Sequence, residues 1–386
     1  MERHRQPVNP ARAEWDAETA FLVALMSQRG VGPRTLARVL VDLGALDQRL
    51  GDLVRLSSGE LRRRYEIDRV PSREDLGRAH RDIAEMQARG IAILRIDDPS
   101  RFDLDEDDYG ELSYPAQLAT TLGAKAPPVL FAAGELSLLA RPGVGFCGSR
   151  EASDRAIGAV AASASDIAKA GMNVISGYAR GVDTAAHKAA LETSGYTTMV
   201  LAEGILKFTP RAELRNLATP YNTLVLSEFP PRMPWSVGNA MKRNSTICAF
   251  ADAMVVVESK LTGGTYAAGV AALELGRPLF VVDYGDNERV APGNRYFIDH
   301  GASPLRRHRL TGLPITKPIL EAARRQAGQD SSDRAEWSPK AFMLTTHLEA
   351  ADRSPVRLGL WDTGSTKLGA RRKDSTESKA TSVSNA

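Results

Sequence analysis

Apolar residues in the middle of the chain form short continuous runs, and the stretches between these runs carry apolar residues at helical spacing. The continuous runs span residues 144–147, 173–176, 198–201, 223–226, 254–258 and 279–283. Helical spacing occurs over residues 154–170, 182–193, 211–217 and 266–275. Apolar strands that alternate with helices are typical of a parallel sheet covered on both faces. The pattern therefore predicts an α/β fold over residues 114–309, a Rossmann-like domain with a doubly wound, mainly parallel sheet.

A separate helical pattern precedes this domain. Apolar residues recur at helical spacing up to Leu25 and again from Leu36, and residues 30–33 between them read Gly-Val-Gly-Pro. Two helices joined by such a turn predict a small all-helical domain of the helix-hairpin-helix (SAM-like) type over residues 15–90. The hairpin could offer backbone N–H groups to a DNA phosphate. A packed connection that binds nothing fits the same residues equally well.

The remaining segments are polar or strongly charged. Residues 1–14 lack the apolar stretch of a secretory signal and are expected to be a disordered N-terminus. Residues 91–113 hold a dense group of carboxylates between Asp97 and Glu111, which predicts a solvated acidic linker because like charges repel. Residues 310–386 have only short apolar clusters, and we expect a mostly disordered tail.

Composition narrows the class of protein. Hydrophobic residues make up 43% of the chain and charged residues 25%, as in globular proteins, and no apolar run reaches the ~18 residues of a membrane span. The two cysteines, Cys147 and Cys248, lie among apolar residues, which favours a reducing cytoplasm. The net charge of +3 permits an anionic partner without requiring one. Scattered histidines and distant cysteines predict no metal site, and we expect no cofactor.

Small residues are concentrated where three of the predicted strands pass into helices. Glycine lets the backbone approach a ligand closely, and the following helix directs unpaired N–H groups and a partial positive charge to the same place. Hydroxyl groups and arginines add donors that suit phosphate. The residues are Gly148, Ser149 and Arg150 in the first turn, Ser176, Gly177, Arg180 and Gly181 in the second, and Thr262, Gly263, Gly264 and Thr265 in the third.

Helix packing alone explains any one of these turns, but three turns at the carboxyl edge of one sheet predict a broad anion-binding crest. A fourth stretch, residues 241–246, contains Lys242, Arg243 and Asn244 and is expected to be a basic turn that extends the crest along a polyanion. Taken alone, it fits an ordinary solvated surface turn better. Aromatic residues make up only 6% of the chain, and Tyr178 in the second turn is the candidate for stacking on a base.

Over residues 114–305 the chain resembles the DNA-processing protein A (DprA/Smf) family, with a weaker match in the N-terminal helices. The motifs that carry the resemblance occur in the family's order. They are Gly148-Ser149-Arg150, residues 176–183 with Ala186-His187, residues 226–231, Arg243-Asn244, residues 256–258, residues 273–278, and Gly293-Asn294. The chain departs from the family at residues 208–213, at Ser245, which stands where the family has an arginine, and in the tail, where no winged helix is evident.

The resemblance implies a protein without catalytic activity that binds single-stranded DNA in a basic groove of its Rossmann-like domain. It further implies a cytoplasmic homodimer that protects DNA and helps to load a RecA-type recombinase during transformation or recombination. Carried over by position, Arg150 would contact phosphate and Arg243 would lie in the second basic turn. Ser176, Gly177 and Gly181 would shape the second phosphate turn.

Two other functions are compatible with parts of the sequence. Residues 143–148 match the glycine spacing of a dinucleotide-binding enzyme, but they lie within a predicted strand, whereas that motif follows one. A small-nucleotide binder or phosphoribohydrolase similar to the LOG type, which could act in defence, would use residues 262–265 with Glu258 or Glu274 as an acid. His187 lies on a predicted helix without a nucleophile at a recognisable spacing, and a packed histidine is the better interpretation.

Overall fold

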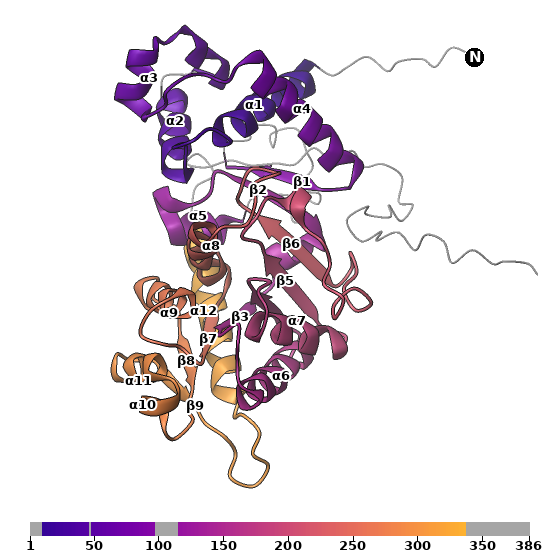
Figure 1. The fold of residues 1–386 in the computed structure, drawn as a ribbon, viewed down its shortest axis with the longest axis vertical. Helices are drawn as coiled ribbons and strands as arrows, with labels where there is room; N and C mark the ends of the chain where they lie inside the picture. Colours follow the sequence, from indigo (N-terminus) through magenta and orange to yellow (C-terminus); the bar gives the residue numbers. More distant parts are fainter. Residues whose placement is uncertain (1–9, 46–47, 97–114, 337–386) are drawn as a thin grey trace, which may run out of the picture.

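The computed structural model describes residues 10–45, 48–96 and 115–336. It consists of one nine-stranded sheet with helices on both faces and a helical unit at one end (Figure 1). The strands are β1 (Ala92–Arg95), β2 (Val129–Gly134), β3 (Gly143–Gly148), β4 (Asn173–Ser176), β5 (Tyr196–Val200), β6 (Thr223–Ser227), β7 (Ala253–Val257), β8 (Leu279–Val282) and β9 (Ser303–Leu305). The helices are α1 (Pro10–Met26), α2 (Pro33–Ala45), α3 (Ser58–Tyr65), α4 (Arg73–Ala88), α5 (Ala116–Leu122), α6 (Asp154–Lys169), α7 (Val182–Glu192), α8 (Val237–Phe250), α9 (Gly264–Glu274), α10 (Asn287–Val290), α11 (Pro292–Asp299) and α12 (Lys317–Glu336).

The sheet is doubly wound and mainly parallel, which confirms the predicted fold class. Its strand order is β1-β2-β6-β5-β4-β3-β7-β8-β9, and strands β3 to β9 all run parallel. The chain moves outward from β3 to β6 and then returns to place β7 on the other side of β3. Parallel strands with this reversal gather their ligands at the carboxyl edge beside the first strand. The fold therefore positions a site where β3, β4 and β7 end.

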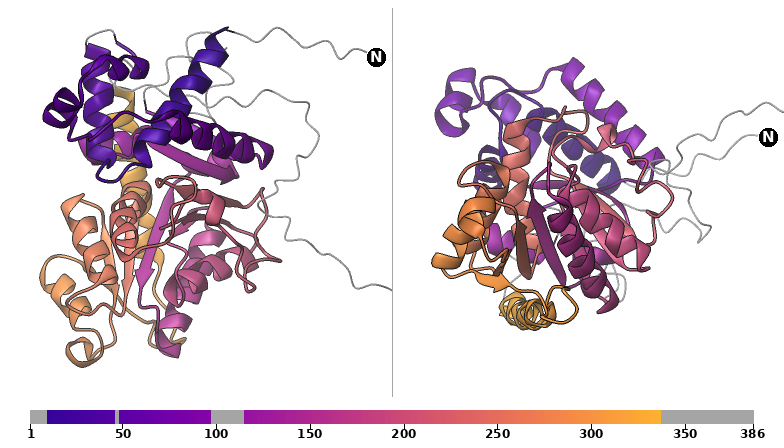
Figure 2. Two further views of the ribbon diagram at one scale, coloured as in Figure 1. Left: turned by 45° about the horizontal axis from the view of Figure 1, so that its top comes forward. Right: turned by 60° about the horizontal axis from the view of Figure 1, so that its bottom comes forward.

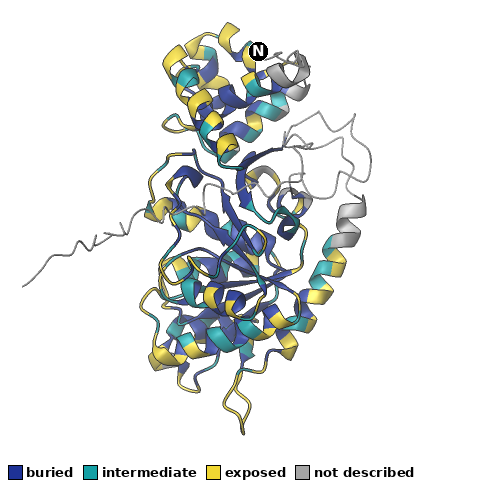
Figure 3. Cartoon of the chain, turned by 90° about the vertical axis from the view of Figure 1, so that its right-hand side faces the viewer, coloured by how far each residue is buried: buried dark blue, intermediate teal, exposed yellow. Residues whose placement is uncertain are grey.

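Three apolar clusters hold the layers together. One cluster packs α5, α8, α9 and α11 on one face of the sheet, and a second packs α6, α7 and α12 on the other face (Figure 2). The third cluster joins the helical unit to strands β1, β2, β5 and β6, and its contacts include Ile93, Phe131 and Val225. Figure 3 shows the resulting distribution, with buried residues in the central strands and exposed residues on the outer faces of the helices. Among the described helices, none has the length and apolar character that crossing a bilayer would require.

All six predicted strands are present, and their ends differ from the prediction by at most two residues. Strands β1, β2 and β9 were not predicted. Strand β1 lies in the expected acidic linker, where it pairs antiparallel with β2, and β2 pairs antiparallel with β6. The linker prediction was therefore wrong for residues 92–95, and its acidic part, residues 97–114, lies outside the described residues.

Four further predictions need correction. Residues 211–217 form successive turns rather than a helix, and residues 241–246 lie inside α8 rather than in a turn. Residues 317–336, expected within the disordered tail, form α12, which buries Ile319 and Ala323 in the second apolar cluster. Helix α1 already begins at Pro10, within the expected disordered N-terminus. Residues 1–9 and 337–386, where we also expected disorder, lie outside the described residues.

Candidate nucleic-acid interface

The first two glycine turns are in direct contact at the carboxyl edge of the sheet. The N–H of Val182, the first residue of α7, donates to the carbonyl of Ser149 at 3.2 Å. Gly181 has a φ of +73°, and a Cβ on it would lie 2.4 Å from the same carbonyl oxygen. Only glycine fits this position without strain, because it tolerates both the left-handed backbone and the close approach. The structure thus brings Arg150 and the second turn together, as the sequence pattern predicted.

A cleft of about 520 Å³ opens between these turns. It is lined by Arg150, Glu151, Gly177, Tyr178, Ala179, Arg180, Ala202, Glu203, Arg211, Trp235 and Arg243. Four of the eleven lining residues are arginines, from the turns after β3 and β4, the loop after β5 and helix α8. Arg150 and Arg180 are exposed, and neither forms an ion pair with any carboxylate in the described part of the chain. The cleft therefore offers free positive charge to an anion.

Arg243 forms the inner wall of the cleft and is only 5% exposed. Its guanidinium fills the space that a side chain on Gly177 would take, because a Cβ there would lie 1.0 Å from Nη1. Arg243 Nη2 lies 3.6 Å from an Asp183 carboxylate oxygen, and its Nε, although buried, has no hydrogen-bond partner among the described residues. Arg243 is thus held by Asp183 while part of its donor capacity remains unused.

The third turn, residues 262–265, contacts the fourth stretch, residues 241–246, which belongs to helix α8 and is not a loop. Asn244 is buried and donates its side-chain amide to the carbonyl of Gly264 at 3.0 Å, which ties α8 to the start of α9. Lys242, two residues earlier in α8, is exposed. Thr262 and Thr265 do not line the cleft but lie across α8 from it, at the carboxyl edge beyond β7. Asn244 thus uses its amide for the α8–α9 contact, and its expected role in phosphate binding stays a prediction.

Ser176 also has a structural role. The side chain is fully buried, and its hydroxyl donates to the carbonyl of Phe146 at 2.7 Å, which joins β4 to β3. This proton is not available to a phosphate. In the same turn the N–H of Ala179 donates to Asp183 at 3.0 Å, so the turn's own carboxylate occupies that donor as well.

The exposed aromatic residue at the cleft is Trp235, which the sequence analysis missed. Trp235 lies in the loop between β6 and α8 and is 46% exposed, and the Arg150 guanidinium lies 5.0 Å from the centre of its ring. Tyr178, the expected stacking residue, is buried instead. Its hydroxyl donates to the carbonyl of Thr209 at 3.0 Å and accepts from the N–H of Arg211 at 2.6 Å. The available sequence signal was a tryptophan directly before Ser236, a residue type that commonly caps helices.

Arg211 and Glu203 are two further cleft residues that the sequence analysis missed. The Arg211 guanidinium lies 4.9 Å from the Tyr178 ring and donates to the Tyr178 carbonyl at 3.1 Å. Burial raises the pKa of Glu203, while the Arg243 and Arg211 guanidiniums favour its charged form. The acid thus faces the arginines inside the cleft, where it offsets part of their charge.

Two groups near the cleft that could act as a nucleophile or a base, Cys147 and His187, are held in inactive forms. Burial raises the pKa of the Cys147 thiol well above its usual range, and the Asp183 carboxylate adds to that rise. Burial, with the Arg243 and Arg211 guanidiniums, lowers the pKa of His187 to about 3, so its imidazole is neutral. His187 Nδ1 lies 2.7 Å from Thr197 Oγ1 inside the core. Within the described ranges, no group of three or more His, Cys, Asp or Glu side chains is arranged to hold a metal ion.

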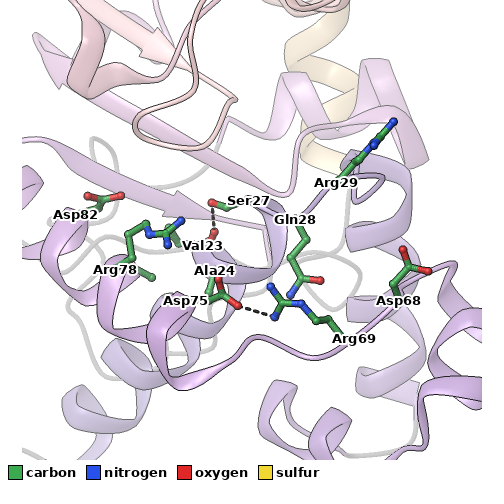
Figure 4. A pocket seen from close by; sticks show the side chains of 11 residues that line it. Val23, Ala24, Ser27, Gln28, Arg29, Asp68, Arg69, Asp75, Arg78 and Asp82 are labelled. Carbon is green, nitrogen blue, oxygen red and sulfur yellow. Dashed lines mark hydrogen bonds and ion pairs between the residues drawn. The ribbon is translucent and has the colours of Figure 1, made fainter.

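A second cleft, of about 370 Å³, lies in the helical unit between the end of α1 and α4 (Figure 4). Its charges are largely paired, since Arg69 lies 2.6 Å from Asp75 and Asp68 lies 2.8 Å from Arg62. The hydrogen bond from Arg69 lowers the pKa of Asp75 well below its usual range. Ion pairs of this kind leave little net charge for a polyanion. The adjoining Gly30 turn joins α1 to α2 as expected, and its contact with DNA remains a prediction.

Comparisons with known proteins agree with this geometry. The family model described as DNA recombination-mediator protein A matches residues 108–310, more than half of the chain. Protein Smf of Escherichia coli is 32% identical over 191 residues, which are 49% of this chain and 50% of that protein. DNA processing protein DprA of Streptococcus pneumoniae is 33% identical over 178 residues, which are 46% of this chain and 63% of that protein. The match thus spans between half and two thirds of the length of these relatives.

A solved structure shows the same fold. The X-ray structure of DNA processing protein A from Streptococcus pneumoniae superimposes with a TM-score of 0.55 at 23% identity. The match covers 81% of this chain and 98% of that chain. The shared architecture therefore extends beyond the sheet to most of the described residues.

Proposed function

This chain belongs to the DNA recombination-mediator protein A family, and we propose that it is a DNA-processing protein that binds single-stranded DNA in the Arg150 cleft. The relatives named above are DNA processing proteins, which supports a nucleic-acid ligand. The cleft itself supports the single-stranded form. A base can stack on an exposed aromatic ring only when it is unpaired, and Trp235 presents such a ring beside the free cation of Arg150.

The pairing of Arg150 with Trp235 is the observation that carries the proposal. Phosphate contacts by Arg150 and Arg180 would hold the backbone without reading sequence, and stacking on Trp235 would hold a base of any identity. Arg211 and Arg243 contribute positive potential from the cleft wall, where they are fixed by Tyr178 and Asp183. Such a site binds DNA with little sequence preference.

We further propose that binding occurs without catalysis. The buried thiol of Cys147 and the neutral imidazole of His187 are unsuited to nucleophilic or general-base chemistry at neutral pH. Family membership supports partnership with a RecA-type recombinase, a homodimer, and action on DNA in the cytoplasm during transformation or recombination. Family resemblance also supports the division into a helical unit at residues 15–90 and a Rossmann-like domain at residues 114–309.

A salt-dependent titration tests the ligand class. We expect single-stranded oligonucleotides to bind with log Kd rising steeply against log salt, with a slope of about 0.7 for each phosphate contact. Duplex DNA should bind more weakly, because its bases cannot reach Trp235. A small nucleotide that saturates the cleft with a shallow salt slope, while oligonucleotides fail to compete, would instead establish the nucleotide-binding alternative.

The variant Arg150→Ala tests whether the DNA measured in this titration binds in the cleft. Losing one phosphate contact and the Trp235 partner should weaken binding about tenfold, equally for poly-dT and mixed sequences. The control is Arg63→Ala, which removes the same charge from the exposed surface of α3 in the helical unit and should leave affinity unchanged. Equal affinity of the Arg150→Ala and Arg63→Ala proteins would remove Arg150 from the site.

A further inference from the structure

Additional arginines follow the carboxyl edge of the sheet beyond the cleft, on the side of β7, β8 and β9. Because strands β3 to β9 are parallel, the segments that follow each of them emerge at this same edge. Arg155 lies in the first turn of α6, and Arg306, Arg307 and Arg309 follow directly after β9. The function proposed above does not use any of these four arginines.

Tyr284, which follows β8, connects the two groups of arginines. Arg155 donates to the Tyr284 carbonyl at 3.1 Å, and its guanidinium lies 4.9 Å from the ring centre. Burial and the Glu258 carboxylate raise the pKa of Tyr284, while the Arg155 and Arg307 guanidiniums oppose that rise. Arg155 therefore packs against this phenol, and Arg307 is near enough to influence its charge. Its hydroxyl is buried and has no hydrogen-bond partner among the described residues.

A short path connects Tyr284 back to the cleft. Ser153 caps the N-terminus of α6, three residues after Arg150. Its N–H donates to the Glu258 carboxylate at 3.0 Å, and its hydroxyl donates to the same group. The arginines from Arg150 to Arg307 thus lie on adjoining segments of a single rim.

The segment after β9 is a protruding hairpin, residues 306–316, which is the exposed loop at the lower tip of Figure 3. Its arms are joined by hydrogen bonds from Ile315 N–H to the Arg306 carbonyl at 2.9 Å and from His308 N–H to the Leu313 carbonyl at 2.8 Å. Arg306, Arg307 and Arg309 are exposed. Of the three, Arg306 alone has a carboxylate neighbour within the described ranges, Asp283 at 4.0 Å.

We propose that Arg155 and the 306–316 hairpin form a second segment of the DNA-binding track, which guides the strand from the Arg150 cleft along the sheet edge to β9. This inference rests on the function proposed above and extends it. Strands β3 and β9 are three positions apart in the sheet, about 14 Å at the usual strand spacing, so a strand that leaves the cleft reaches the hairpin within a few nucleotides. Phosphate is the ligand that suits exposed, mostly unpaired arginines on a backbone-braced hairpin.

Removing the three hairpin charges tests the track. We would measure the binding of fluorescent oligothymidylates of about 6 and about 20 nucleotides to the full chain carrying Arg306→Ala, Arg307→Ala and Arg309→Ala. The short strand fills the cleft alone, so its affinity should stay within about twofold of the parent protein. The long strand should bind at least about tenfold more weakly, with a salt slope reduced by about 2, or 0.7 per lost contact. Because the arms are joined by backbone hydrogen bonds, alanine should preserve the hairpin.

The control carries Arg63→Ala, Arg73→Ala and Arg81→Ala, three exposed positions on α3 and α4 that remove the same net charge. This protein should bind both strands as the parent does. If the hairpin variant and the control bind the long strand equally, the second segment does not exist, although the cleft proposal stands. If the parent protein binds neither strand, the cleft proposal itself fails. A hairpin variant that changes only the oligomeric state, through the exposed Leu310 and Leu313, would also overturn the DNA assignment.

Discussion

At the scale of single residues, the cleft depends on an arginine that occupies the place of a missing side chain. Gly177→Ala would put a Cβ 1.0 Å from the Arg243 guanidinium, which must then leave its position and its contact with Asp183. The backbone at Gly177 does not need positive φ, so the collision alone would cause the effect. We expect a loss of about 1–3 kcal/mol in the free energy of unfolding and about tenfold weaker binding of single-stranded DNA.

Urea unfolding and anisotropy titrations would measure both changes. Gly158→Ala is the matched control, because this helical glycine in α6 has nothing within 4 Å of the added Cβ, and alanine favours a helix. That protein should be as stable as the parent or more so, with unchanged binding. A Gly177→Ala protein that behaves like the Gly158→Ala protein would show that Arg243 is not confined by Gly177.

Trp235 offers a direct signal of the bound strand. Stacking of a base on this ring should quench tryptophan fluorescence, and Trp235→Ala should remove most of the quenching and weaken binding about fivefold to tenfold. Trp235→Phe should retain most of the affinity, because phenylalanine still presents a flat ring. Trp15→Phe, which changes a buried tryptophan of the helical unit, is the control and should leave the quenching intact. Full quenching in the Trp235→Ala protein would exclude stacking at this position.

The sequence identified the two turns that meet, after β3 and β4, but it also placed the turn after β7 beside them, and it did not show the role of each side chain. Ser176 and Asn244 are polar and lie in the matching motifs, yet both are buried and stabilise the fold through hydrogen bonds to carbonyl groups. Tyr178 was the expected stacking residue because it lies inside a glycine turn, and Trp235 was not considered. Tyr178 is buried because Thr209 and Arg211 pack around it and bind its hydroxyl. These residues are about thirty positions away in the chain, and the local sequence pattern does not show that they meet.

At the scale of elements, the buried parallel strands were predictable and helix α8 was not. The six central strands are continuously apolar because both faces are covered, a pattern that short windows of sequence reveal. Helix α8 buries Asn239, Arg243, Asn244 and Thr246 on its inner side, so its polar residues do not mark an outer face. Without an amphipathic period the segment resembled a turn. These buried polar side chains line the cleft or form hydrogen bonds to neighbouring elements. Their presence on the inner side explains why the sequence pattern did not predict the helix.

The edge strands were missed for a different reason. Strand β1 has four residues and β9 has three, too few for any period to stand out, and β1 ends in Arg95. Arg95 is 1% exposed because its guanidinium donates to Thr19 Oγ1 at 3.0 Å and lies 3.3 Å from Glu18. Both partners belong to α1, more than seventy residues away in the chain. Such long-range partners offset the cost of burying the charge. A pattern read over a few neighbouring residues does not reveal them.

At the scale of the whole molecule, the helical unit is part of the structure that positions the cleft. Arg232 lies in the loop between β6 and α8, and its Nε lies 2.7 Å from the Asp82 carboxylate on α4. It also pairs with Glu85 on the same helix. Trp235 lies three residues further along this loop, so the helical unit holds the loop from one side while the sheet holds it from the other. The N-terminal unit thereby helps to position the loop that carries Trp235.

Arg232→Ala should therefore affect both stability and binding. It would leave the Asp82 side chain, only 10% exposed, without its partner, and since Arg232 is itself about half exposed we expect a loss of about 1–2 kcal/mol. Amide hydrogen exchange should rise in α4, and DNA affinity should fall about twofold to fivefold as Trp235 loses its fixed position. Arg78→Ala, which removes an exposed ion pair with Glu74 on the same helix, should change stability by less than about 0.5 kcal/mol and binding not at all.

A double-mutant cycle separates positioning of Trp235 from general loosening of the protein. If Arg232 acts through the tryptophan, its removal should cost binding in the parent protein but nothing further in the Trp235→Ala protein, because the ring it positions is gone. If the two losses simply add, Arg232 influences DNA by another route and the loop does not transmit the effect. Hydrogen exchange in α4 should rise to the same extent in both backgrounds, since the Asp82 contact is lost in each. The cycle thus tests whether the helical unit and the cleft are mechanically coupled through this single loop.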